Sequence, residues 1–62
     1  MTEEREVIFE FRRVGAAVKV SAVDVATGTE VSIVGDPAVG EDALRRIARR
    51  KLDYVLARQP RK

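Results

Sequence analysis

The spacing of the apolar residues changes once along this chain, at Gly40, and that change limits the folds open to it. Before Gly40, apolar residues alternate with polar ones, which is the period of a half-buried strand. After Gly40 they recur at a helical period and form one stripe, made of Leu44, Ile47, Ala48, Leu52, Val55 and Leu56. The sequence therefore predicts strands first and one helix last, an α+β fold.

Three segments carry the strand pattern, at about 6–14, 17–26 and 29–35. Gly15 marks a tight turn at the first junction. At the second, Ala26-Thr27-Gly28 is typical of a three-residue hairpin loop, with Gly28 at the position that needs a positive φ. Because short hairpin connections join antiparallel neighbours, we predict a three-stranded antiparallel meander.

The alternation of the second strand slips by one residue, since Val20 and Val23 have opposite parity. Such a slip turns half of a strand away from the core unless an extra residue is accommodated. We therefore predict a β-bulge around Ser21–Ala22. The resulting register places Val23 opposite Val31 and Val20 opposite Ile33.

Residues 41–58 are predicted to form a helix packed on one face of the sheet. Glu41 and Asp42 at its start and Arg58 at its end suit the helix dipole, and Pro60 follows it. The other face can meet water, because it would carry Glu10, Arg12, Lys19 and Ser32. We expect residues 1–62 to form a single small domain with disordered ends at 1–5 and 59–62.

Composition argues against catalysis. The 62 residues include no Cys and no His, which removes thiolate nucleophiles, the commonest metal ligand and the usual base for Ser or Thr. The loop Gly35–Gly40 has the glycine spacing of a phosphate-binding loop, but Glu41 and Asp42 follow it where Lys and Ser or Thr are needed. Asp36 adds a third carboxylate, still too few oxygen ligands for a calcium loop. We predict no enzyme activity, no cofactor and no bound metal.

The basic face of the predicted helix is the candidate binding site. Residues 31–62 hold eight basic and four acidic residues, and the candidate partner-binding side chains are Arg45, Arg46, Arg49 and Arg50. We predict a small non-catalytic interaction module whose partner is a protein, bound through these arginines or through an exposed sheet edge. The alternative is weak, sequence-independent nucleic-acid binding through the same helix. A solvated helix face explains the same pattern without a partner.

Five apolar residues find no place in the predicted core, namely Ile8, Val14, Val34, Val39 and Tyr54. Together with unpaired edge strands, they leave a homodimer open. No apolar run approaches the roughly 20 residues that span a bilayer. The segment Met1–Glu6 is acidic where a signal peptide is basic, so we predict a cytoplasmic protein without a membrane span.

Three segments resemble a family of short bacterial proteins known only as an uncharacterised domain of unknown function. They are Val7-Ile8-Phe9-Glu10-Phe11-Arg12, the run from Val18 to Val34 with its Thr27-Gly28-Thr29-Glu30-Val31, and Arg50-Lys51-Leu52-Asp53-Tyr54-Val55-Leu56. The resemblance covers roughly residues 7–58. It implies the same β-β-β-α pattern in one small domain, and it brings no functional residues, because the family has no assigned activity.

Overall fold

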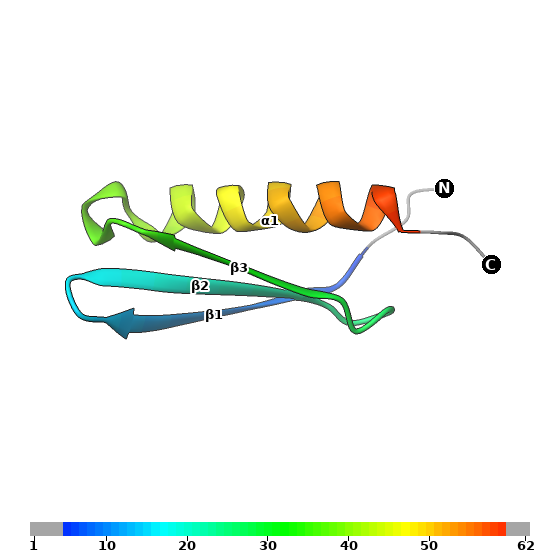
Figure 1. Cartoon of the computed structure of the whole chain (residues 1–62), viewed down its shortest axis with the longest axis horizontal. Coiled ribbons are helices and arrows are strands. Elements are labelled where there is room, and N and C mark those ends of the chain that lie inside the picture. Colours follow the sequence, from blue (N-terminus) through cyan, green and yellow to red (C-terminus); the bar gives the residue numbers. More distant parts are fainter. Residues whose placement is uncertain (1–4, 60–62) are drawn as a thin grey trace.

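The computed structural model describes residues 5–59, which form three strands followed by one long helix (Figure 1). The strands are β1 (Val7–Val14), β2 (Ala17–Asp24) and β3 (Glu30–Gly35). A short 3-10 turn, η1 (Pro37–Val39), leads into helix α1 (Glu41–Arg58). The sheet has the order β1-β2-β3 with antiparallel neighbours. The predicted α+β meander with a C-terminal helix is confirmed.

Both strand ladders run without interruption, so the predicted bulge at Ser21–Ala22 is wrong. Ala22 pairs with Phe9 of β1 and with Val31 of β3, and it is fully buried. The core therefore continues in the parity of Val20 through a small side chain that the helix can approach. A pattern search for large apolar residues passes over such a position.

The uninterrupted register also changes the partner of Val23, which lies opposite Glu30 rather than Val31. Val23 therefore belongs to the face away from α1, where it is half-buried. The predicted pair of Val20 with Ile33 is confirmed.

The connection from β2 to β3 is longer than the predicted three-residue loop, since it runs from Val25 to Thr29. The Asp24 N–H donates to the Thr29 carbonyl at 2.8 Å, and the Gly28 N–H donates to the Asp24 carbonyl at 2.7 Å. Gly28 has a φ of 75°, the left-handed conformation that the sequence predicted. Val25 is 46% exposed and stands outside the core.

The core lies between α1 and the two strands beneath it. Its buried apolar residues are Val20, Ala22, Val31, Leu44, Ala48 and Leu52. Figure 1 shows β3 next to the start of α1, with the end of β1 on the far side of β2 there. At the start of α1, a Cβ on Gly35 would lie only 2.6 Å from the Leu44 Cδ2 atom. Glycine at the end of β3 therefore lets the first turn of the helix approach the sheet.

Ile47 was predicted to belong to the apolar stripe, yet it is 47% exposed. One turn further along the same flank, the Lys51 ammonium donates to the Ser32 carbonyl of β3 at 2.8 Å. This flank therefore overhangs the outer edge of β3 instead of facing the sheet.

The predicted disordered ends fall largely outside the described residues, at 1–4 and 60–62. Arg5 and Gln59 lie within the described range, and both make side-chain hydrogen bonds.

Candidate interaction surface

The four predicted arginines all lie on α1, but two of them form ion pairs with acidic residues of the same helix. Arg45 forms an ion pair with Asp42 at 2.9 Å, and Arg49 forms one with Asp53 at 3.3 Å. These spacings of three and four residues are the ones that place helical side chains side by side. Among the described residues, Arg46 and Arg50 form no ion pair, and both are exposed on the outer face of the helix. Of the four predicted arginines, two therefore have a guanidinium group without an ion-pair partner within residues 5–59.

Arg45 has a second role, because its guanidinium covers the aromatic rings of β1. Its Cζ atom lies 5.8 Å from the centroid of the Phe9 ring and 5.5 Å from that of Phe11. Cation–π attraction operates at these distances. Since α1 packs over β2 and β3, Arg45 extends the cover of the helix toward the otherwise less protected rings.

The face of the sheet opposite α1 has no second layer among the described residues. Three of its apolar side chains are largely exposed: Ile8 at 55%, Val14 at 52% and Val34 at 68%. Glu10 and Arg12, in the middle of β1, lie between Ile8 and Val14 on this face, which is the side predicted for them. We refer to this surface, the side chains of Ile8, Glu10, Arg12, Val14 and Val34 with their neighbours on β2, as the open face.

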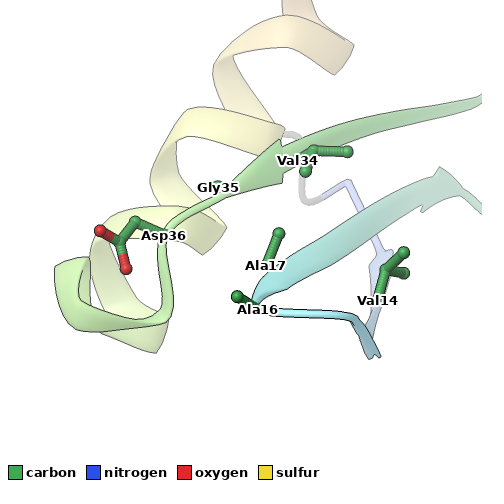
Figure 2. Close-up of a pocket in the computed structure, with 6 residues that line it drawn as sticks. All are labelled: Val14, Ala16, Ala17, Val34, Gly35 and Asp36. Carbon is green, nitrogen blue, oxygen red and sulfur yellow. The ribbon is translucent and has the colours of Figure 1, made fainter.

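A shallow depression of about 580 Å³ lies at one end of the open face (Figure 2). Val14, Ala17 and Val34 contribute apolar side chains to it, and Asp36 lies at its rim. The Asp36 carboxylate accepts a hydrogen bond from the Ala38 N–H at 2.9 Å, which caps η1. The depression therefore offers apolar contact, and its carboxylate already has a structural role.

The two edges of the sheet differ in how far they are covered. The Val25 N–H donates to the Glu6 carbonyl at 3.1 Å. This bond shows which residues direct their backbone groups toward β2, namely Glu6 and every second residue after it. By alternation, Phe9, Phe11 and Arg13 direct their backbone N–H and C=O groups away from the sheet. By the same alternation, Ser32 of β3 directs its backbone groups away from the sheet, and the Lys51 ammonium donates a hydrogen bond to the Ser32 carbonyl. A charged group held at a sheet edge hinders strand pairing, and α1 holds the Lys51 ammonium at β3, so β1 is the more open edge.

Sequence reasoning missed one buried charged residue, Asp24 at the end of β2, which has no exposed area. The Thr27 hydroxyl and amide both donate to its Oδ2 atom, at 2.7 and 3.1 Å. The Arg5 guanidinium reaches its Oδ1 atom at 3.4 Å. An aspartate three residues before a threonine, in a loop with glycine, is the turn pattern that could have revealed this cluster.

These hydrogen bonds decide the charge state of Asp24. The bond from the Thr27 hydroxyl lowers the pKa of the carboxyl below its ordinary value of 3.8, and the Thr27 amide and Arg5 act in the same direction. Burial acts against them by raising the pKa. The lowered pKa keeps Asp24 ionised at neutral pH, where it holds the β2–β3 loop and Arg5 together.

Within residues 5–59, no three Asp or Glu side chains gather where they could hold a metal ion. Asp36 and Asp42, two of the three carboxylates weighed as cation ligands, instead cap η1 and pair with Arg45. No helix in the described range is long and apolar enough to cross a membrane.

The chain belongs to a family described as a domain of unknown function (DUF6898), whose model matches residues 4–59. This confirms the family resemblance predicted from the sequence, while the bacterial origin stays a prediction. No curated protein and no solved structure matched the chain.

Proposed function

We propose that the protein is a small non-catalytic module that binds another protein through the open face of its sheet. The observation that carries the proposal is the exposure of Ile8, Val14 and Val34 on a sheet face that no described residue covers. Exposed apolar side chains bordered by polar or charged ones are typical of protein interaction sites. Glu10 and Arg12 supply such charges between Ile8 and Val14.

The test is capture from native lysate followed by direct binding measurements with the purified partner. A Val34→Lys variant should lose the partner, because the ammonium would have to be buried in the interface. Val39→Lys is the matched control, since Val39 is 51% exposed but lies on η1, outside the sheet. A partner held equally well by both variants, or no partner above background, contradicts the proposal.

A second candidate function is weak nucleic-acid binding through Arg46 and Arg50, which are exposed and form no ion pair among the described residues. Two phosphate contacts give a slope of roughly −2 in a plot of log affinity against log salt concentration for duplex DNA. An amide-resolved titration with short duplex RNA and DNA, at about 20 and about 200 mM salt, tests this function. Shifts confined to α1 that vanish at high salt and in Arg46→Gln/Arg50→Gln would support it, and their absence at both salts excludes it.

The proposal also includes a cytoplasmic location and a homodimer. The uncovered edge of β1 supports the homodimer. Fractionation of cells and the experiments of the next subsection test them.

A further inference from the structure

The edge of β1 carries a pattern that fits a second copy of itself. We propose that β1 pairs antiparallel with β1 of a second copy, about a two-fold axis at Phe11, so that two sheets join into one of six strands. This inference rests on the homodimer included in the proposed function and does not require that the open face bind another protein.

Backbone geometry is the first support. Phe9, Phe11 and Arg13 direct their N–H and C=O groups outward, so a two-fold axis at Phe11 makes Phe11 a hydrogen-bonded pair with its own copy. The same axis makes Phe9 and Arg13 the next hydrogen-bonded pair on either side. The strand is eight residues long and forms an edge of the sheet, and its last residues lie on the side away from the start of the helix (Figure 1), which leaves this edge accessible.

Charge complementarity is the second support, and it selects one register. With the axis at Phe11, Glu10 of each copy lies opposite Arg12 of the other, and Ile8 lies opposite Val14. Opposite charges directly across a ladder are stabilising, and like charges are destabilising. A shift to either neighbouring register places Glu10 opposite Glu10 or Arg12 opposite Arg12. Only the register centred on Phe11 pairs both charges and both exposed apolar residues.

The side chains on the helix side of β1 fit the same arrangement. Arg13 of one copy would lie opposite Phe9 of the other, where its guanidinium can cover the ring as Arg45 does within the chain. The competing edge, β3, has only six residues, and Lys51 occupies the Ser32 carbonyl there. The structure thus favours pairing through β1 over pairing through β3.

The decisive experiment exchanges the two charges. Sedimentation equilibrium is measured from about 10 μM to about 1 mM protein, because a strand-edge interface is small and its affinity modest. Glu10→Arg and Arg12→Glu should each weaken self-association about tenfold or more, since each creates two like-charge pairs by symmetry. An equimolar mixture of the two single variants should regain a one-to-one dimer, and so should the Glu10→Arg/Arg12→Glu double variant.

Both substitutions are expected to preserve the fold of one chain, because both positions are exposed. Glu10 and Arg12 are exposed, and Arg12 lies opposite Lys19 on β2, so Arg12→Glu places a carboxylate beside an ammonium within the chain. An amide spectrum of each variant checks the fold. A variant that keeps its stability but loses the dimer shows that the altered residue acts in the interface and not in the fold of the single chain.

A second readout distinguishes edge pairing from stacking of two open faces, which would also bring Glu10 near Arg12. In a mixture of labelled and unlabelled chains, edge pairing gives a cross-chain contact between the Hα protons of Glu10 and Arg12. Stacked sheets lie about 10 Å apart and give none.

A monomer at about 1 mM, an unrescued mixture, or a dimer without this Hα contact overturns the inference. If the protein stays monomeric but still captures a protein through Val34, the result contradicts self-pairing and leaves the open-face proposal in place. If the protein forms the β1-paired dimer but captures no protein, the result contradicts the open-face proposal and leaves self-pairing in place.

Discussion

The two edge strands of the sheet, β3 and β1, are covered by the single helix to very different extents. On the β3 side, α1 packs against the strand, and the Lys51 ammonium occupies the outward Ser32 carbonyl. On the β1 side, the rings of Phe9 and Phe11 pack against the core but stay half-buried, and the Arg45 guanidinium lies over them. Because α1 packs over β2 and β3, β1 lies one further strand spacing, about 4.8 Å, beyond the strands that the helix covers. The fold is therefore stabilised mainly over β2 and β3, and β1 is the strand that we propose pairs with a second copy.

The largest effect is expected beneath the helix. Leu52 is fully buried, so Leu52→Ala should lower the free energy of unfolding by about 2–5 kcal/mol through lost burial and a cavity. Val34→Ala is the control, because Val34 is 68% exposed, and its effect should stay within about 0.5 kcal/mol. Chemical denaturation at low protein concentration measures both. Equal losses for the two variants would show that the helix does not define the core.

The next effect concerns Asp24, the buried carboxylate at the end of the middle strand. Its folded pKa lies below 3.8, so the unfolded chain binds the proton more readily, and the ionised group stabilises the fold above about pH 3.8. This contribution is lost as the pH falls through the folded pKa. The free energy of unfolding should therefore fall more steeply with acidification below pH 3.8 in the unaltered protein than in Asp24→Asn.

The control for Asp24→Asn is Asp53→Asn. In the unaltered protein the Asp53 side chain is 55% exposed, and its carboxylate pairs with Arg49 at the surface. This variant should keep the acid dependence of the unaltered protein. An identical acid profile for Asp24→Asn would mean that the cluster with Thr27 and Arg5 does not stabilise the ionised form.

The smallest effect is expected on the β1 side. Arg45→Gln removes the cation over Phe9 and Phe11 and should lower the free energy of unfolding by about 0.5–1 kcal/mol. Arg46→Gln, one residue along on the exposed face, should change it by less than about 0.5 kcal/mol. Denaturation curves at matched ionic strength provide the comparison. A larger loss for Arg46→Gln would contradict the assigned role of Arg45.

The sequence alone predicted the element order, the helix bounds and the conformation of Gly28, because periodicity and turn residues are local signals. It failed at Ala22, where a small core residue looked like a break in the pattern, and a bulge was inferred instead. The role of Gly35 depends on the approach of Leu44 from a distant helix, which periodicity does not encode.

The candidate site was predicted in part. The positions of Arg46 and Arg50 on the outer helix face follow from helical spacing alone. The engagement of Arg45 with Phe9 and Phe11 required tertiary structure, since it depends on where the helix lies across the sheet. The difference between the two sheet edges has the same origin, because Lys51 reaches Ser32 from a distant part of the chain.

Amide hydrogen exchange at two protein concentrations tests most directly the claim that β1 is the free binding strand. We predict that the amides of Phe9, Phe11 and Arg13 exchange more slowly at high protein concentration, because pairing with a second copy engages them. The outward amides of Glu30, Ser32 and Val34 on β3 should exchange at the same rate at both concentrations. Slowing on β3 instead, or no slowing on either edge, would contradict the account.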